Sequence, residues 1–442
     1  MLPPGRRALL ASRTSTAASR PAVRGRPVTG PGRAEPDVTA VILTHDADPD
    51  TLRDCVASVA RQDRPVQILL ADNGAGVGRP LPEDVARAYA GRRLSLAQNR
   101  GFADGINRAL SHVTTPFALV LNDDTVLDMG AADAMRRALE GDARAVAVAP
   151  KIFLAGHPLV LDAVGTVVRP DGLAFNRGIG QLDIGQYDDA RPVFGASFAA
   201  CLLRRSAFDE GEVGPLEDRF FMYYEDVDWC YRAGLRGWRV LSAPDAIVHH
   251  QHGHTARRRP DGFRHYFLYR NPLWLALRNF EPGNAARALG RRLAATASRA
   301  LRGPHRRAAA RALRDFARGV PAHWLARRRI QAQRRVPDTA LLGHAEGEVP
   351  CFDHDRCEPR ADFGTLAAMY ARRCAARPAD GDRRIADLAR KLATGPARPA
   401  LQAELLGLLS REPEPVRGFA EGLLGVSATG AACPARGREG LV

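Results

Sequence analysis

The sequence is nearly free of lysine and has no long apolar run. Lysine occurs only at positions 151 and 391 of the 442 residues, so almost every basic side chain is an arginine. No window approaches the roughly 18 to 20 uncharged apolar residues that a transmembrane helix requires. The N-terminus lacks a continuous apolar core, which argues against a secretory signal. The seven cysteines are scattered and odd in number, which favours a reducing cytoplasm over a disulfide framework.

The positive charge is concentrated in one segment of the chain. Residues 251–340 contain 21 arginines and four acidic residues, a local charge of +17, whereas the whole chain carries +15. Because aromatic and aliphatic side chains accompany these arginines, the segment is predicted to dock on an anionic membrane surface. The alternative is that GC-rich coding produces the arginine bias. Specific nucleic-acid binding is not expected, because no recognised reader motif accompanies the charge.

The length of 442 residues, 45% of them hydrophobic, allows at least one large core and two or three domains. We expect four parts: a basic tail without regular structure (1–36), an α/β domain (37–280), a basic segment of amphipathic helices (281–340) and a helical C-terminal region of unknown role (341–442). In the last part, Cys351, His354 and Cys357 are interpreted as ordinary side chains, because a Cys-x5-Cys pair with one histidine is a weak metal motif.

Segments typical of strands and helices alternate between residues 38 and 149. The expected strands are Val38–Thr44, Val66–Ala71, Leu94–Ala97, Phe117–Leu121 and Ala145–Ala149. The expected helices lie within Pro49–Arg61, Glu83–Tyr89, Asn99–Leu110 and Met129–Leu139. This alternation predicts a mostly parallel, Rossmann-like sheet with ligands at the carboxyl ends of its strands. The polar residues expected at that edge are Thr44, His45, Asp72, Asn73, Asn99 and Asn122 to Asp124.

A carboxylate cluster follows a run of bulky residues farther along. Phe220–Tyr224 are all large, and Glu225 and Asp226 come directly after them. Burying carboxylates beside such large side chains costs free energy unless the carboxylates are paired, solvated or used for proton transfer. A histidine-rich stretch, residues 249–254, follows another strand-like segment. Together these features suggest a metal site and a base in one cleft.

The residues after this cluster predict a helix. Residues 225–233 have helical character, and Gly234 is expected to cap the C-terminus of the helix. Asp228 is interpreted as structural, because Arg232 lies four residues on and is placed to pair with it.

Several motifs together resemble the signature elements of family 2 inverting glycosyltransferases. In chain order they are Val41-Ile42-Leu43-Thr44-His45, Ala71-Asp72-Asn73, Asn99-Arg100-Gly101-Phe102-Ala103-x-Gly105-x-Asn107, Leu121-Asn122-Asp123-Asp124, Glu225-Asp226 and His250-x-x-Gly253-x-Thr255. The resemblance covers roughly residues 38–280 and is strongest to the rhamnosyltransferase-like and galactofuranosyltransferase-like enzymes of bacterial surface polysaccharide synthesis. It implies a GT-A fold, the α/β fold of nucleotide-diphospho-sugar transferases, with a basic helical C-terminal extension.

The resemblance implies a donor site along the strand ends. Asp72 would hydrogen-bond the nucleotide base, and a glycine-containing loop would bring backbone amides to the phosphate or sugar. The implied donor-binding residues are Thr44, His45, Asp72, Asn99, Gly101, Gly105, Asn107, Asn122 and Arg270. The alternatives are an Asx turn at Asp72 and glycines that serve turn geometry alone.

A divalent cation, Mg²⁺ or Mn²⁺, is implied because the diphosphate leaving group must be stabilised. Asp124 is the implied metal ligand, and His250 would complete the metal shell or contact the diphosphate. Asp226 would take the proton of the acceptor hydroxyl, with Glu225 orienting the acceptor. The alternatives are that Asp124 belongs to a helix cap and that Asp226 begins a solvated helix. Two small residues would line the acceptor channel, Gly195 and Ser197.

The expected function is the inverting transfer of a single sugar from a nucleotide-diphosphate sugar to a glycan or lipid-linked glycan. The preferred donor is dTDP-rhamnose, with UDP-galactofuranose or another activated hexose as alternatives. No Gln-x-x-Arg-Trp motif is present, which argues against a polymerising synthase. We expect a cytoplasmic protein that docks peripherally on the inner face of the cell membrane. The competing hypothesis is a non-catalytic carbohydrate- or membrane-binding protein that retains the scaffold.

Overall fold

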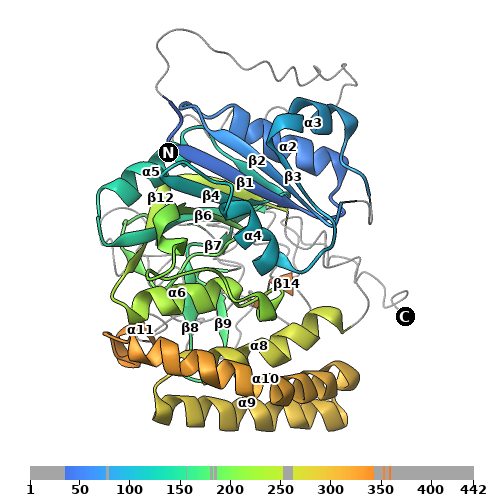
Figure 1. The fold of residues 1–442 in the computed structure, drawn as a ribbon, viewed down its shortest axis with the longest axis vertical. Coiled ribbons are helices and arrows are strands. Elements are labelled where there is room, and N and C mark those ends of the chain that lie inside the picture. Colours follow the sequence, from blue (N-terminus) through green and yellow to red (C-terminus); the bar gives the residue numbers. More distant parts are fainter. Residues whose placement is uncertain are drawn as a thin grey trace, which may run out of the picture.

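The computed structural model describes residues 35–75, 79–155, 157–179, 183, 187–251, 262–342, 352–353 and 358–359. Within these residues, a mixed sheet of ten strands lies above a group of long helices (Figure 1). The order of its main path is β10-β12-β6-β11-β4-β1-β2-β3, and β5 and β7 pair with β12 and β6. The predicted α/β architecture is therefore confirmed.

The half of the sheet built from the first four strands is parallel. These strands are β1 (Val38–Thr44), β2 (Gln67–Asn73), β3 (Arg93–Leu96) and β4 (Phe117–Asn122). β1 pairs in parallel with β2 and β4, and β2 pairs in parallel with β3. This part of the sheet follows the predicted alternation of strands and helices, and it brings the carboxyl ends of β1, β2 and β4 together.

The other half of the sheet is mixed. Its strands are β5 (Thr125–Leu127), β6 (Ala145–Leu154), β7 (His157–Ala163), β10 (Pro192–Val193), β11 (Ala200–Arg204) and β12 (Arg239–His250). β11 runs antiparallel to both β4 and β6, whereas β12 is parallel to β6. The chain enters β11 from a loop and not from a crossover helix, which permits the antiparallel direction. A separate hairpin joins β8 (Thr166–Val168) and β9 (Ala174–Asn176).

Helices cover both faces of the sheet. On one face lie α2 (Pro49–Ala60), α3 (Glu83–Ala88) and α5 (Ala131–Glu140). On the other lie α4 (Phe102–Leu110), α6 (Glu225–Leu235) and α8 (Phe263–Asn279). Ile42 of β1 belongs to the first core, and Val41 and Leu43 belong to the second. Because β1 is buried on both faces, its central residues Ala40–Leu43 are all apolar, which makes the strand recognisable in the sequence.

The C-terminus of α6 differs from the expected glycine cap. Gly234 lies inside the helix, and the left-handed residue after the helix is Gly237, with φ +86°. The amides of Gly237 and Trp238 donate to the carbonyls of Gly234 and Ala233, which is the Schellman arrangement. A methyl group on Gly234 would lie 2.7 Å from Leu341 Cδ2, so glycine is needed there for close helix packing and not for capping.

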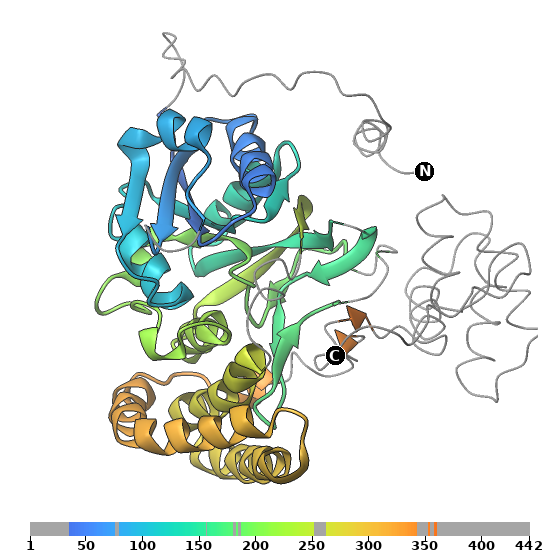
Figure 2. The same cartoon turned by 90° about the vertical axis from the view of Figure 1, so that its right-hand side faces the viewer.

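The basic segment forms helices, as predicted. These are α9 (Pro282–Arg302), α10 (Arg306–Ala332) and the short α11 (Asp338–Leu342), and they lie with α8 at the lower end of the molecule in both views (Figures 1 and 2). The remaining short elements are η2 (Ala90–Arg92), η3 (Arg205–Phe208), η4 (Asp218–Phe220), β13 (Phe352–Asp353) and β14 (Glu358–Pro359).

The buried Asp338 joins this segment to α6. Its carboxylate accepts hydrogen bonds from the Tyr231 hydroxyl at 2.9 Å, the Glu281 amide at 2.7 Å and Asn284 Nδ2 at 2.9 Å. Arg334 Nη1 lies 2.9 Å from the same carboxylate. The segment after residue 280 is thus bonded to the helix that begins with Glu225 and Asp226.

Several arginines of this segment serve the fold. Arg327 donates to the carbonyls of Leu277 and Phe280. Gln331 donates to the carbonyls of Arg278 and Asn279. Arg334 donates to the Asn279 carbonyl as well. These bonds satisfy the carbonyl groups that the C-terminus of α8 leaves without helical partners. Part of the high positive charge is therefore used inside the protein.

Lys151 of β6 is only 2% exposed, and its ammonium lies 3.1 Å from Asp183 and 2.6 Å from Asp188.

In the part of the chain that the structure describes, no helix combines the length and the apolar character needed to span a bilayer.

Candidate active site

Polar side chains gather where β1, β2 and β4 end. The strand register places Thr44 beside Asp72 and Leu43 beside Asn122. Asp72 is oriented by Arg93, whose Nη2 lies 2.6 Å from its carboxylate. The residues predicted at this edge from the sequence are neighbours in the structure.

The loop after β3 closes on the same edge. A methyl group on Gly74 would lie 3.2 Å from His45 Nδ1 and 3.3 Å from Asn99 Cβ. Asn99 Oδ1 accepts from the Gly101 amide at 2.9 Å and from Asn73 Nδ2 at 3.3 Å. The side-chain amide of Asn99 therefore turns inward to shape its own loop, which is the behaviour of an Asx turn.

The two glycines of this loop and of α4 are required by close contacts. Gly101 has φ +103°, and a methyl group there would overlap the carbonyl oxygen of Phe221 and lie 2.8 Å from its Cα. A methyl group on Gly105 would lie 2.8 Å from Leu43 Cδ1. Gly105 brings α4 against β1, and Gly101 brings the loop against the segment that precedes Glu225.

A chain of three buried side chains lies beyond β4. Asp124 Oδ1 is 3.1 Å from His250 Nε2, and His250 Nδ1 is 2.7 Å from Asp162 Oδ2. Asp124, His250 and Asp162 are 8%, 7% and 1% exposed. Burial alone would lower the pKa of His250, but the two carboxylates outweigh it and raise this pKa well above its usual range. The imidazole therefore carries positive charge next to Asp124.

The neighbouring Asp123 faces the end of β1. The His45 amide donates to its carboxylate at 3.4 Å. Burial, together with the nearby charge of Asp124, raises the pKa of Asp123 to about 7. This edge of the sheet thus holds two adjacent carboxyl groups in different environments.

In the described ranges, no three His, Cys, Asp or Glu side chains form a group that would hold a metal ion by themselves. His249, next to His250, lies 3.3 Å from an Asp128 oxygen. His252 and His254, which the sequence reasoning left unassigned, fall outside the described residues.

Asp226 lies in the first turn of α6. Its two carboxylate oxygens accept from the amides of Phe198 at 3.3 Å and Val227 at 2.8 Å. Burial raises the pKa of Asp226 and outweighs the opposing effect of these amides. Glu225 is 6% exposed, and its Oε2 has no hydrogen-bond partner among the described residues. Burial and the adjacent Asp226 raise the pKa of Glu225 well above its usual range.

The small-residue run lies between the two acidic groups. A methyl group on Gly195 would lie 2.9 Å from Cys230 Cβ, which brings this run against α6. Ser197 is half-buried and accepts from the Ala199 amide at 3.4 Å. The Ala199 carbonyl accepts from the Asn122 amide at 2.8 Å. Residues 197–199 therefore connect the end of β4 with the start of α6.

Two predicted donor-binding residues lie elsewhere. Asn107 exchanges two hydrogen bonds of 2.9 Å with the backbone of Leu216 and donates to Asp218 at 2.7 Å. Arg270 is 6% exposed and donates to the carbonyls of residues 219 and 220. Both side chains hold the segment that leads into α6, so the structure does not bring them to the strand ends.

That segment has an unusual backbone. Phe221, Tyr223 and Tyr224 have φ values of +68°, +62° and +74°. A left-handed conformation costs a residue with a side chain about 1–2 kcal/mol. Three such residues directly before Glu225 indicate that surrounding contacts impose this conformation, as occurs at functional sites.

Asp228 anchors α6 from behind. Its fully buried carboxylate lies 2.9 Å from Arg232 Nε and 2.9 Å from Arg278 Nε, and it accepts from Asn279 at 2.8 Å. Burial alone would raise the pKa of Asp228, but the two guanidinium groups lower it to about 2. The structural role predicted for Asp228 from the Arg232 spacing is confirmed.

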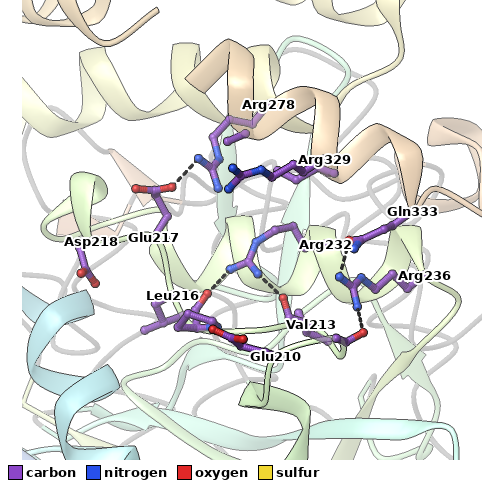
Figure 3. A pocket seen from close by; sticks show the side chains of 14 residues that line it. Glu210, Val213, Leu216, Glu217, Asp218, Arg232, Arg236, Arg278, Arg329 and Gln333 are labelled. Carbon is purple, nitrogen blue, oxygen red and sulfur yellow. Dashed lines mark hydrogen bonds and ion pairs between the residues drawn. The ribbon is translucent and has the colours of Figure 1, made fainter. Parts of the chain in front are cut away.

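A hollow of about 580 Å³ lies on this rear side of α6, between α10 and the loop before η4 (Figure 3). Figure 3 shows Glu217 pointing toward Arg278, and Arg232 pointing toward backbone carbonyls of the loop. Arg236 bonds to Gly211 and Gln333. Because these guanidinium groups are used within the protein, we assign no ligand to this hollow.

The match to a known family decides the class of this protein. The family described as glycosyltransferase like family 2 matches residues 36–263, just over half of the chain. The chain is a family 2 glycosyltransferase. The glycosyltransferase is 30% identical over 254 residues to the N-acetylglucosaminyl-diphospho-decaprenol L-rhamnosyltransferase of Mycobacterium tuberculosis. The matched region covers 51% of this chain and 79% of the relative. The low-salt glycan biosynthesis hexosyltransferase Agl10 of Haloferax volcanii is 28% identical over 120 residues, 26% of this chain and 38% of the relative.

Solved structures show a more distant similarity. The mannosyltransferase PcManGT from Pyrobaculum calidifontis, in complex with GDP-Man and Mn²⁺, is 16% identical to the glycosyltransferase. The match covers 67% of this chain and 86% of that one, with a TM-score of 0.39. S. aureus TarS 1-349 in complex with UDP-GlcNAc is 13% identical, with 72% and 93% covered and a TM-score of 0.43.

The sequence assigns no role to three residues that build the site. Asn73 was expected at the strand edge without a role of its own, and its side-chain amide holds the loop with a 3.0 Å bond to the Gly101 carbonyl. Asp162 lies in an ordinary apolar strand, where nothing marks it as the partner of His250. Asn271 follows Arg270 directly, and its contacts depend on an irregular segment fifty residues upstream.

Proposed function

We propose that this glycosyltransferase transfers one rhamnosyl residue, with inversion, from a nucleotide-diphosphate sugar to a lipid-linked N-acetylglucosamine in bacterial surface polysaccharide synthesis. The observation that carries the chemistry is the half-buried Asp226 carboxylate, held by the amides of Phe198 and Val227. The sugar and acceptor rest on the similarity to the mycobacterial rhamnosyltransferase named above.

Asp226 is the proposed base. It takes the proton of the acceptor hydroxyl as that oxygen bonds to the anomeric carbon, while the bond from this carbon to the diphosphate breaks and the nucleoside diphosphate leaves. Burial raises the pKa of Asp226, so the carboxylate is more basic than an exposed aspartate. A raised pKa suits a base that works near neutral pH.

Glu225 is the proposed acceptor ligand. Its Oε2 is buried without a hydrogen-bond partner among the described residues, so it is available to a hydroxyl of the bound sugar. Such a bond would recover the free energy lost by burying the carboxyl group alone. Gly195 and Ser197, beside the start of α6, are proposed to leave room for the acceptor.

The strand ends are the proposed donor site. Asp72 would recognise the nucleotide, with Thr44 and His45 beside it, and Asn122 would face the diphosphate. Mg²⁺ is usually held by one or two carboxylates together with substrate phosphates, so a full set of protein ligands is not required. Asp124 fits such a site as an oxygen ligand, and the charged His250 would attract the diphosphate. A bound Mg²⁺ or Mn²⁺ would stabilise the leaving diphosphate.

The test is a transfer assay with defined substrates. The purified protein would receive dTDP-rhamnose, UDP-galactose or UDP-galactofuranose, with and without Mn²⁺, and N-acetylglucosaminyl-diphospho-polyprenol as acceptor. Rhamnosyl transfer is expected, with loss of turnover but retained donor binding in Asp226→Asn. Asp124→Ala is expected to lose metal-dependent donor binding by calorimetry. The exposed Asp245 provides the control, Asp245→Asn, which should behave as wild type.

The results separate the possibilities. Transfer from a galactofuranose donor alone would replace rhamnose as the sugar. Donor binding without transfer to this acceptor would overturn the proposed acceptor. If no donor binds with or without metal, the scaffold functions as a non-catalytic binding protein.

We also propose that the outer face of α9 and α10 docks on an anionic membrane. Leu301 is 77% exposed at the end of α9, beside the exposed Arg302, and Arg306 and Arg307 begin α10. An exposed apolar side chain surrounded by arginines suits a surface of anionic lipids. A lipid-linked acceptor would be reached from that position.

Vesicle binding tests this surface. Changing Arg302, Arg306 and Arg307 to Glu should abolish binding to vesicles that contain anionic lipid, and salt should weaken wild-type binding. The control makes the same charge change at the exposed Arg61, Arg87 and Arg92, which lie at the end of α2, in α3 and in η2. Helices α2 and α3 lie at the end of the molecule opposite α9 and α10 (Figure 1). Equal losses in both variants would show that only net charge matters, which contradicts a specific face.

A further inference from the structure

The segment before Glu225 contains a rare turn. The Met222 amide donates to the Phe220 carbonyl at 2.8 Å, around Phe221 with φ +68° and ψ −59°. These values define the strained form of the γ-turn, and the left-handed Tyr223 and Tyr224 follow it. The position of the two carboxylates that follow therefore depends on a backbone that does not prefer this conformation.

Neighbouring groups hold five consecutive carbonyls of this segment, those of residues 219–223. Arg270 Nη2 donates to the carbonyls of residues 219 and 220 at 3.0 and 2.9 Å. Asn271 Nδ2 lies 3.2, 2.9 and 2.6 Å from those of residues 220, 222 and 223, which share its two N–H groups. The remaining carbonyl, of Phe221, accepts from the Phe102 amide at 2.6 Å. Both α8 and the N-terminus of α4 therefore contact the segment.

The orientation of the Asn271 amide is fixed by its neighbour. Arg270 Nε donates to Asn271 Oδ1 at 2.9 Å, so the oxygen faces the guanidinium and the two N–H groups face the carbonyls. Asn271 is fully buried. Arg270 is itself held against the Trp274 ring, 4.0 Å from its centroid, and by the Tyr266 hydroxyl. The pair is a rigid donor group aimed at the turn.

We propose that Asn271 is a positioning residue of the active site, which holds residues 220–223 so that Glu225 and Asp226 face the acceptor. This inference rests on the proposed function of those two carboxylates. Asn271 acts through the backbone and does not touch the substrate. Arg270 supports it by fixing the orientation of the side-chain amide.

The experiment uses the full-length protein with an isosteric change. Asn271→Asp keeps the size and the bond to Arg270 but places a carboxyl oxygen against three carbonyl oxygens. Turnover is expected to fall about 10²-fold, because displacement of a catalytic group by about 1 Å has that effect. Calorimetric donor affinity should stay unchanged, because none of the contacts of Asn271 involves the strand ends. Hydrogen exchange should increase in peptides that cover residues 220–228 and at the Phe102 amide, which donates to the Phe221 carbonyl, and not elsewhere.

The control is Leu275→Ala, which removes a fully buried side chain from the same helix but none of the hydrogen bonds to the turn. It should lower thermal stability while leaving the turnover of the folded protein unchanged. If Asn271→Asp fails to fold, Arg270→Lys replaces it, with a smaller loss of turnover and the same local change in exchange. Equal turnover in Asn271→Asp, or in Arg270→Lys where that replaces it, and in the Leu275→Ala control would overturn the proposal.

The two proposals fail in different ways. If wild type neither binds a donor nor transfers sugar, the proposed function fails, and hydrogen exchange still tests the contact between Asn271 and the turn. If wild type is active and Asn271→Asp retains its turnover, only the positioning role is wrong.

Discussion

At the residue scale, close contacts with single atoms decide whether a position accepts a side chain, and Gly101 is the clearest case. Its φ of +103° and the close carbonyl of Phe221 leave no room for a side chain. We expect Gly101→Ala to destabilise the fold by about 2–4 kcal/mol, from the left-handed backbone and the overlap together. Transfer should fall as well, because the segment before Glu225 must move.

Denaturant unfolding with a parallel transfer assay measures both effects. Gly283→Ala is the control, because no atom lies within 4 Å of the added methyl group and Gly283 is helical. It should be neutral or slightly stabilising. A Gly101→Ala protein with wild-type stability and turnover would show that the loop and the turn move independently.

At the scale of elements, α6, α8 and α10 meet at a buried charge network. Arg278 Nη1 lies 2.6 Å from Glu217 and 3.1 Å from His323 Nδ1. His323 is fully buried against the Trp274 ring. Burial, aided by the positive charge of Arg278, lowers the pKa of His323 from 6.5 to about 4. The neutral imidazole is therefore part of the folded state.

This shift predicts how stability depends on pH. The unfolded histidine binds a proton more readily than the folded one, so the stabilising effect is complete above pH 6.5 and is lost as pH falls toward about 4. The loss is on the order of 3 kcal/mol. Denaturant unfolding of His323→Gln should show a smaller decrease over this range than wild type. Identical pH dependence in both proteins would show that His323 is not the titrating group.

The elements differ in how well the sequence predicts them. Val38–Thr44 was predicted with the correct bounds, because a strand buried on both faces is mostly apolar, with Thr39 as its one polar residue before Thr44. The antiparallel β11 was not anticipated, because strand direction depends on how the chain arrives and leaves no local pattern. Gly234 was wrongly expected to cap α6. The sequence does not distinguish a glycine that is needed for packing, here against Leu341, from a glycine that is needed for a turn.

At the scale of the whole molecule, residues 281–342 form one body with the sheet domain. Asp338 is fully buried and bonds to Tyr231 of α6 and to Glu281 and Asn284 at the start of α9. Asp338→Asn is expected to destabilise the entire fold by about 3–5 kcal/mol, because Arg334 would lose its buried partner. Thermal unfolding should shift as a single transition.

The matched control is Asp209→Asn on the surface. Asp209 is exposed and paired with Arg205, and such pairs contribute about 0–1 kcal/mol. A separate low-temperature transition in Asp338→Asn, with the sheet domain unfolding as in wild type, would show that the two parts are independent.

The candidate site was predicted from the sequence only where local rules apply. The carboxyl ends of parallel strands lie at one edge, so Thr44, Asp72 and Asn122 were expected to be neighbours and are. Asn107 and Arg270 were also expected at the donor site from the resemblance, yet they bind backbone carbonyls of residues 216, 219 and 220. Such contacts depend on the path of an irregular segment, which no periodic pattern reveals.

The near absence of lysine gives this protein an unusual chemical property. Lys151 is one of only two lysines, and it is sequestered in β6 by Asp183 and Asp188. An amine-reactive ester should therefore acylate it only when Asp183 and Asp188 move away from the ammonium. The rate at which mass spectrometry detects the modified Lys151 would then report how often these two ion pairs open in the unmutated protein.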